Sequence, residues 1–333
     1  MVDFTVAVPT YNGEHRLPGV FEALRSQTGL DGISWEILIV DNNSHDQTAA
    51  VVQQCQETSA VPVRYVLEQR QGAAYARDRA IHESESALVG FLDDDNIPAA
   101  DWVAAAYHFA QAHPKAGAIA SRIYADYEVE PPEQFHRISA FLAITQRGDQ
   151  PLLYHPQQRI LPPSAGLVVR RQTWLSIMPK HLVLSGRVEG SMLTGEDIEM
   201  LSYIQQSGWD IWYNPAMTLT HKIPQHRLQR DYLLPFFRGI GLSRHVTRML
   251  NVAPWKRPML AIAHFLNDGR KVLLHLYRHR QQVRTDLVAA CEFQLFLSSL
   301  ESPFYLWRKG YLKRRSADSS PNSSLQQPTP SRS

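Results

Sequence analysis

The sequence predicts an α/β protein with a mostly parallel sheet flanked by helices, followed by a C-terminal helical extension. Three observations support this. Short apolar runs alternate with amphipathic helical segments through the first third of the chain. Several of these runs end in polar loops, as strands of ligand-binding sheets do. Finally, residues from about 229 to 312 have a helical pattern with no strand-like runs.

The order of the first elements predicts a parallel arrangement. Continuous apolar runs are typical of strands buried on both faces. Strand, helix, strand in succession predicts parallel strands with helices on both faces of the sheet. The strand-like runs are residues 4–8, 35–40, 63–67 and 88–92, and the helical segments between them are about 15–27, 46–57 and 72–82.

Three of these strands end in polar loops, at residues 10–14, 41–44 and 93–96. The last contains three consecutive carboxylates, Asp93, Asp94 and Asp95. Like charges so close together are costly to keep ionised. A divalent cation with bound phosphates would remove that cost, because hard cations prefer carboxylate and phosphate oxygens. The alternative is a solvated acidic turn at the start of the next helix.

The second half of the chain is less regular. We expect a helix over 101–113 and a strand over 116–120, then an irregular insert at 122–163 where an acceptor would be recognised. Further expected elements are a strand near 164–170, a helix from Gly195 through residue 204, two strands at 209–213 and 216–220, and late helices with breaks near Pro254 and Pro258.

Composition indicates an ordinary globular protein. The chain has 333 residues, 44% of them hydrophobic and 20% charged, which is ample for a large core. Cys55 and Cys291 are too few for a disulfide framework and fit a reducing compartment. We expect no signal peptide and no membrane span, and therefore a cytoplasmic location.

Charge is divided along the chain. Residues 1–226 contain 16 Lys and Arg against 26 Asp and Glu, whereas residues 227–315 contain 17 against 5. We therefore predict a catalytic domain at 1–226, a basic helical extension at 227–315 and a disordered tail at 316–333. Basic residues beside aromatic and aliphatic ones suit peripheral contact with the inner face of a membrane. Packing on the catalytic domain or on a second copy is the alternative.

Four segments resemble the family 2 glycosyltransferases, which have the GT-A fold, a Rossmann-like α/β fold. The resemblance covers about residues 4–245, and it is greatest to bacterial members that build surface or extracellular polysaccharides. Glycines of the Rossmann and phosphate-loop kinds are absent. The four segments are Val8-Pro9-Thr10-Tyr11-Asn12, Val40 to Thr48, Gly72 to Asp78, and Phe91-Leu92-Asp93-Asp94-Asp95.

The resemblance implies a nucleotide-sugar donor site, usually for a UDP-sugar. Asp41 would accept a hydrogen bond from the base, and Arg77 would lie near the diphosphate. The family commonly has Asn where this chain has Asp78, which leaves the local network open. Gly166, after Ala165, would allow close approach under the donor sugar. The base pocket would be shaped by Pro9, Thr10, Tyr11 and Glu14.

The resemblance also implies a divalent metal, Mg²⁺ or Mn²⁺. Asp93 and Asp95 match the family's Asp-x-Asp motif, with Asp95 as the direct ligand and Asp93 toward the ribose or a metal-bound water. Asp94 is counted with the nucleotide site. His221 is a candidate for the metal or the diphosphate, although a histidine at a strand end is as often structural.

Glu196 and Asp197 match the family's Glu-Asp motif. The resemblance assigns the catalytic base to Asp197 and an orienting role to Glu196. A sugar transfer with inversion needs a carboxylate to take the proton of the attacking hydroxyl. The alternative is that acidic residues are simply favoured in the first turn of a helix by its dipole.

The expected activity is therefore inverting, hexosyltransferase-type transfer to a hydroxyl of a glycan or lipid-linked acceptor, with no nucleic-acid partner. Arg227 and residues 238–241 would contact the diphosphate or shape the acceptor side. A nucleotidyltransferase would normally show a Gly-rich basic loop after the first strand, where this chain has Pro9 to Gly13. A non-catalytic carbohydrate-binding relative is the other alternative.

Overall fold

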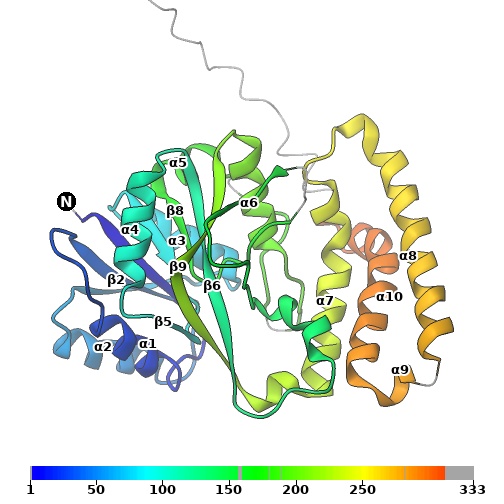
Figure 1. Cartoon of the computed structure of the whole chain (residues 1–333), viewed down its shortest axis with the longest axis horizontal. Helices are drawn as coiled ribbons and strands as arrows, with labels where there is room; N and C mark the ends of the chain where they lie inside the picture. The colour runs from blue at the N-terminus through cyan, green and yellow to red at the C-terminus, as the bar shows by residue number, and fades with distance from the viewer. Residues whose placement is uncertain (1, 157–159, 180, 189, 281, 312–333) are drawn as a thin grey trace, which may run out of the picture.

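The computed structural model describes residues 2–156, 160–179, 181–188, 190–280 and 282–311, so the predicted tail at 316–333 lies outside the described residues. The described chain forms one nine-stranded sheet in the order β3-β2-β1-β4-β8-β6-β9-β5, with β7 paired to β9 (Figure 1). The strands are β1 (Phe4–Thr10), β2 (Trp35–Asp41), β3 (Val63–Leu67), β4 (Leu88–Phe91), β5 (Asn96–Pro98), β6 (Ala116–Tyr127), β7 (Leu152–Leu153), β8 (Leu167–Arg170) and β9 (Asp210–Ile223).

Helices cover both faces of this sheet, as expected. The α-helices are α1 (Leu17–Arg25), α2 (Thr48–Thr58), α3 (Ala73–Glu83), α4 (Trp102–Ala112), α5 (Arg171–Ile177), α6 (Glu196–Gln206), α7 (Arg230–Met249), α8 (Arg257–His279), α9 (Gln282–Thr285) and α10 (Leu287–Arg308). Short 3₁₀ helices are η1 (Phe135–Arg137), η2 (Ser139–Leu142), η4 (Gln225–Leu228) and η5 (Pro254–Lys256).

The alternation of side chains along the strands separates two cores. Phe4, Val6 and Val8 of β1 pack with α1, α2 and α4 on one face. Ala7 packs with α3, α5 and α6 on the other face. All seven residues of β2 are buried, which explains the apolar run from Ile37 to Val40. The α/β prediction is confirmed.

The sheet is more mixed than the sequence suggested. Strands β1 to β4 are parallel, but β8 runs antiparallel to both β4 and β6. The two expected strands at 209–213 and 216–220 are one strand, β9, which remains paired to β6 across an irregularity between Asn214 and Thr218. Pro215 lies in that irregularity, and a proline there looks like a strand end in sequence. The apolar stretch at 135–145 forms η1 and η2 rather than an α-helix.

The late helices form a layered unit beside the sheet. Helix α7 lies next to the sheet domain, with α10 and then α8 farther out (Figure 1). Gly241 allows the close approach of α7 and α10, since a Cβ there would lie 2.6 Å from the Ser298 Cβ. Pro254 and Pro258 mark the connection between α7 and α8, as predicted. Among the described residues, no helix has the length and apolar character needed to cross a membrane.

Candidate functional site

A cleft of about 680 Å³ opens at the carboxyl ends of β1 and β4 and is bounded by α6 and α7. This volume is in the range of small-ligand sites, and the position is where open α/β sheets bind ligands. Residues of α7 such as Tyr232 and Arg244 line it, so the site draws on both sides of the predicted boundary at residue 226. Ten of the thirteen predicted site residues line the cleft: Pro9, Thr10, Tyr11, Arg77, Asp93, Asp94, Asp95, Glu196, Asp197 and His221.

Each carboxylate of the Asp triplet is paired with a different arginine. Asp93 Oδ1 lies 3.2 Å from Arg77 of α3. Asp94 accepts two hydrogen bonds of 2.8 Å from Arg16, which precedes α1, and one of 2.6 Å from Thr10. Asp95 Oδ2 lies 2.7 Å from Arg227 of η4. Three cations therefore offset part of the like-charge repulsion, although burial still raises the pKa of Asp94.

Asp95 and His221 lie together at the base of this arrangement. His221 Nδ1 is 2.9 Å from the Leu142 carbonyl, which can only accept, so Nδ1 carries the proton. Its Nε2 then faces Asp95 Oδ2 at 3.5 Å and Arg227 at 3.2 Å. Burial tends to raise the pKa of Asp95, but His221 and Arg227 outweigh it and hold that pKa below the usual range.

Arg77 is a buried cation that connects the triplet to α6. Its guanidinium lies 3.2 Å from Asp93 and 3.3 Å from Glu196. Burial lowers its pKa, but Asp93, Glu196 and Asp197 together raise it. Its Nε has no hydrogen-bond partner among the described residues.

Asp197 is a carboxylate whose surroundings raise its pKa. Burial, followed by the charge of Glu196, raises the pKa of Asp197 to about 6, against the attraction of Arg77. Its Oδ1 accepts the Ile198 amide at 2.8 Å. Glu196 differs, because one oxygen pairs with Arg77 and the other accepts the Gly195 amide at 3.0 Å. Glu196 is thus held in place by two partners, whereas Asp197 is the carboxylate whose pKa is raised toward neutral pH.

Three predicted site residues do not line the cleft. Both carboxylate oxygens of Asp41 accept hydrogen bonds within the protein, from the Ser44 amide at 2.8 Å and the Tyr65 hydroxyl at 2.7 Å. Burial and the bond to Asp41 raise the pKa of Tyr65 to about 12. Glu14 accepts the Gln47 amide at 2.7 Å. Both residues hold the first two polar loops in position.

Gly166 is required by packing. Its φ is +63°, and a Cβ there would lie 2.2 Å from Leu219 Cδ2. Its carbonyl accepts the Ser121 hydroxyl at 2.6 Å. The neighbouring Ser164 and Ala165 line the cleft instead.

The loop after β1 and the loop after β2 form one framework. The amides of Asn12, Gly13 and Glu14 donate to the side chains of Ser44, Thr48 and Asp46, at 2.9, 2.8 and 3.1 Å. This explains why polar residues recur at both strand ends. The framework positions Thr10 and Tyr11 at the cleft.

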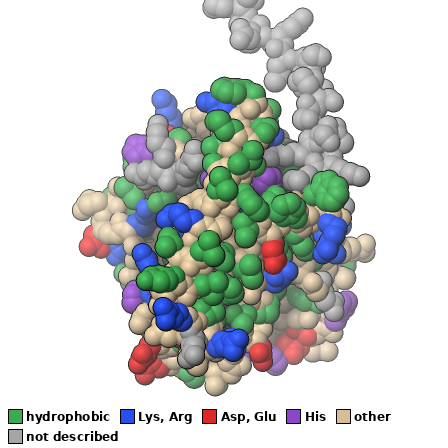
Figure 2. All heavy atoms as spheres, turned by 90° about the vertical axis from the view of Figure 1, so that its right-hand side faces the viewer, with side chains coloured by type: hydrophobic (Ala, Val, Ile, Leu, Met, Phe, Trp, Pro, Cys, Tyr) green, Lys and Arg blue, Asp and Glu red, His purple; other side chains and the backbone are tan. Residues whose placement is uncertain are grey.

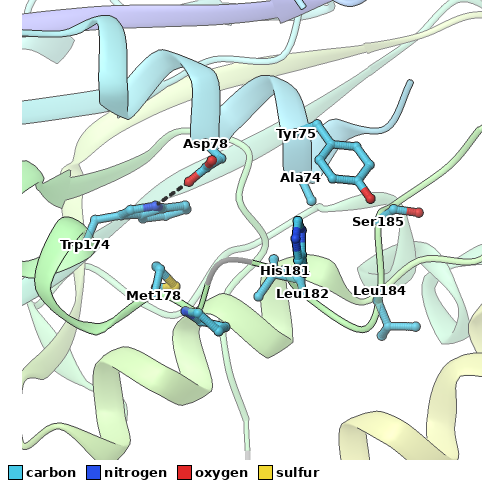
Figure 3. A pocket seen from close by; sticks show the side chains of 10 residues that line it. Ala74, Tyr75, Asp78, Trp174, Met178, His181, Leu182, Leu184 and Ser185 are labelled. Atoms are coloured by element: carbon cyan, nitrogen blue, oxygen red, sulfur yellow. Dashed lines mark hydrogen bonds between the residues drawn. The ribbon is translucent and has the colours of Figure 1, made fainter. Parts of the chain in front are cut away.

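Asp78 does not belong to this cleft. It lies in a small separate pocket between α3 and residues 174–185, where its Oδ1 accepts the Trp174 indole N–H at 3.4 Å (Figure 3). His82 is 3.6 Å from its other oxygen. Asp78 therefore takes no direct part in the Arg77 network.

Sequence reasoning missed several cleft residues. Arg16, Arg187 and Arg244 add positive charge, and Tyr232 of α7 adds an aromatic ring. Of these four residues, only Arg16 could have been found from sequence, because it follows the first polar loop at residues 10–14. Residues 238–241 were expected to contact the diphosphate or shape the acceptor side. Ile240 of this segment lines the cleft, whereas Arg238 pairs with Glu301 at 3.2 Å.

Solved structures with the same architecture are nucleotide-sugar enzymes of the GT-A fold. The mannosyltransferase PcManGT from Pyrobaculum calidifontis, solved with GDP-Man and Mn²⁺, is 18% identical, with a TM-score of 0.56 over 92% of this chain and 87% of that one. A fragment of Staphylococcus aureus TarS in complex with UDP-GlcNAc is 14% identical, with a TM-score of 0.52 over 93% and 92%. At these identities the likeness shows the fold alone.

Sequence relatives give the family. The family described as "Glycosyl transferase family 2" matches residues 5–170. Glycosyltransferase AglE of Haloferax volcanii is 30% identical over 30% of this chain and 32% of its own length. The Escherichia coli enzyme WfgD, named UDP-Glc:alpha-D-GlcNAc-diphosphoundecaprenol beta-1,3-glucosyltransferase, is 30% identical over 31% and 38%. The match thus spans about a third of the curated relatives' length.

The fold is that of the GT-A class. The chain belongs to glycosyl transferase family 2.

Proposed function

We propose that this enzyme transfers a sugar, with inversion, from a nucleotide-diphosphate donor to a hydroxyl acceptor. The observation that carries the proposal is Asp197, whose pKa is raised to about 6 in a cleft that also holds Arg77 and the Asp triplet. A carboxylate of this kind can take the proton of an attacking hydroxyl at neutral pH. An acidic residue placed only for the helix dipole would not need burial beside Arg77.

Arginines offer a site for the donor diphosphate. Arg77, Arg187 and Arg244 line the cleft, and guanidinium groups match phosphate oxygens in geometry and charge. The unpartnered Nε of Arg77 is a buried donor that a phosphate oxygen would satisfy. Thr10 and Tyr11 are available for the base, and uracil is the base that we expect. Asp41 would have to accept a base N–H beside its two internal bonds.

The residues also fit a divalent metal, Mg²⁺ or Mn²⁺. Asp95 and Asp93 supply hard carboxylate oxygens, and Asp93 is the less buried of the two. His221 has its Nδ1–H held by a backbone carbonyl, which is the arrangement found behind metal-ligating histidines. The three side chains are not already gathered as a ligand set among the described residues. When bound, the metal would neutralise charge on the leaving diphosphate.

Metal binding would compete with Arg227 for the Asp95 carboxylate. These two groups lie 2.7 Å apart, and Arg227 is mostly buried. We therefore propose that the donor binds together with the metal, since its phosphates give the displaced guanidinium new partners.

The proposed acceptor is a glycan or a lipid-linked sugar. WfgD is named for a lipid-diphosphate-linked acceptor, and this supports the second class. Phe141, Pro162 and Met192 line the cleft with apolar surface, which suits packing against a sugar ring. Glu196, fixed by Arg77, would keep the first turn of α6 and its base oriented toward that acceptor.

The first test is calorimetric titration of UDP into the protein, with and without Mn²⁺. We expect binding that strengthens at least tenfold with Mn²⁺, because the metal screens the diphosphate from the triplet. GDP serves as the control for base preference. If neither nucleotide binds under either condition, the donor assignment is wrong.

The raised pKa of Asp197 predicts the pH dependence of transfer. The base acts only when ionised, so activity should be full above the pKa of about 6 and fall about tenfold per pH unit below it. An unshifted aspartate would keep activity down to about pH 4. The measurement is kcat/KM against pH, with UDP binding followed in parallel. A profile that stays flat down to pH 4.5 would contradict the assignment of Asp197.

A further inference from the structure

The outer face of α8 is an exposed apolar surface. Of the 18 exposed large hydrophobic side chains in the described part of the chain, 11 lie between Trp255 and Trp307. On α8 the most exposed recur every three to seven residues and so form one stripe along the helix. The stripe consists of Met259, Ile262, Leu266, Leu273 and Tyr277, which are 65%, 64%, 66%, 70% and 73% exposed.

This surface is continuous and partly hollowed. Figure 2 shows the face of the molecule formed by the late helices, where hydrophobic side chains cover a broad central area with Lys and Arg around it. A shallow hollow of about 540 Å³ lies between α8 and α10, lined by Phe265, Leu266, Leu274 and Leu300 among others. Isolated exposed hydrophobic residues need no explanation, but a contiguous apolar area of this kind indicates a binding surface.

Apart from one buried aspartate, the charged side chains of α8 are all positive. Its only acidic residue is Asp268, which is buried and paired with Arg248 of α7. Its other charged side chains are all cationic: Arg257, Arg270, Lys271, Arg278 and Arg280, the last directly after the helix. On α10, Glu301 pairs with Arg238 and Glu292 pairs with Arg137. Arg270 lies within the apolar stripe, between Leu266 and Leu273, and the other cations border it. No free carboxylate from these two helices opposes these cations.

Aromatic residues lie at the ends of the stripe. Trp255 is 75% exposed, and the Lys256 ammonium lies 4.8 Å from its ring centroid. Tyr277 lies at the other end, with the Arg280 guanidinium 6.0 Å from its ring. Amphipathic aromatic rings beside cations are typical of groups that lie at the level of lipid headgroups.

We propose that α8 docks this enzyme on an anionic lipid surface, lying in the plane of the interface with its apolar stripe among the acyl chains. The proposal rests on the proposed function, because docking would hold the cleft near acceptors carried by lipids. The positive charge of the late helices argues against a second copy of this chain as the partner of the stripe. Residues 227–315 carry 17 Lys and Arg against 5 Asp and Glu, so two such faces would repel, whereas anionic headgroups attract them.

The geometry places the membrane on the side of α8 that faces away from the sheet. Helix α8 packs on α10, and α10 packs on α7, whose other side lines the cleft. Packed helix axes are about 8–10 Å apart, so roughly 20 Å separates the stripe from the cleft. The stripe would therefore anchor the enzyme and would not itself bind the acceptor sugar.

The test is flotation of the full chain with vesicles, without nucleotide or metal. Vesicles of phosphatidylcholine alone are compared with vesicles containing about a third phosphatidylglycerol. The wild type should bind the anionic vesicles at least tenfold more tightly than neutral ones. Leu266→Gln with Leu273→Gln removes apolar surface without changing charge and should lower binding at least tenfold.

A matched control is Leu67→Gln on β3, which replaces a leucine that is 44% exposed and lies far from α8. It should bind vesicles as the wild type does. Binding by the double variant equal to wild type, or a wild type that ignores anionic vesicles, would overturn the proposal. So would a wild type that is dimeric in light scattering and becomes monomeric in the double variant, since the stripe would then be a contact between copies.

Metal-dependent UDP binding, measured without vesicles, separates this proposal from the proposed function. It should be the same in the double variant and the wild type. Loss of vesicle binding with intact UDP binding identifies α8 as the membrane surface. Absence of UDP binding in both proteins would refute the donor site and leave the vesicle result to stand by itself.

Discussion

Replacing Asp197 with Asn is expected to lower kcat by about 10²–10⁴-fold, because the acceptor hydroxyl loses its base. UDP affinity should remain within about threefold of wild type, since Asp197 is placed on the acceptor side of the proposed reaction. Stability should not fall, because the change removes a like charge next to Glu196. The measurements are single-turnover transfer, UDP titration and thermal unfolding.

Asp78→Asn is the matched control for this experiment. Asp78 follows Arg77 in sequence but lies in the separate pocket beside Trp174. The same chemical change there should leave kcat near the wild-type value. An Asp197→Asn enzyme that turns over normally would remove Asp197 from the mechanism, and a similar loss in Asp78→Asn would show that the assay reports general damage.

Replacing Asp95 with Asn is expected to abolish turnover and to remove the Mn²⁺ dependence of UDP binding, because the main carboxylate ligand is lost. The sequence by itself predicts that substitution of Asp95 leaves the fold intact. The structure predicts a cost in addition, since Arg227 and His221 would lose the charge that they face at 2.7 and 3.5 Å. Removing one partner of a buried ion pair typically costs about 3–5 kcal/mol, and less when Asn keeps the hydrogen bonds.

Asp94→Asn distinguishes the metal role from the structural cost. Asp94 is equally buried, but its partners are Arg16 and Thr10. This variant should lose stability in thermal unfolding and keep the Mn²⁺ dependence of UDP binding. If Asp95→Asn binds UDP with unchanged Mn²⁺ dependence, Asp95 is not the metal ligand, and its charge serves only its partners Arg227 and His221.

Some features of the site could be predicted because they follow from local chemistry. The strands that lead to Thr10, Asp41 and Asp93 are parallel neighbours, so their carboxyl ends must meet at one edge. Asp197 was assigned because Glu196 and Asp197 resemble the family's Glu-Asp motif, and the structure places both at the start of α6. This is why ten of thirteen predicted residues line one cleft. Asp41, Glu14 and Gly166 were assigned through the family resemblance, and the structure shows internal hydrogen bonds at the first two and close packing at Gly166.

Sequence by itself determined the order of the first four strands and the helices between them, the position of the acidic triplet after a strand, and the basic character of the late helices. Only the tertiary structure decided what neutralises the triplet. Its repulsion suggested a metal, but Arg16, Arg77 and Arg227 approach it from three separate elements. The structure also decided which face of α8 is left exposed. An amphipathic pattern shows that one face is apolar, but only packing shows whether another helix already covers it.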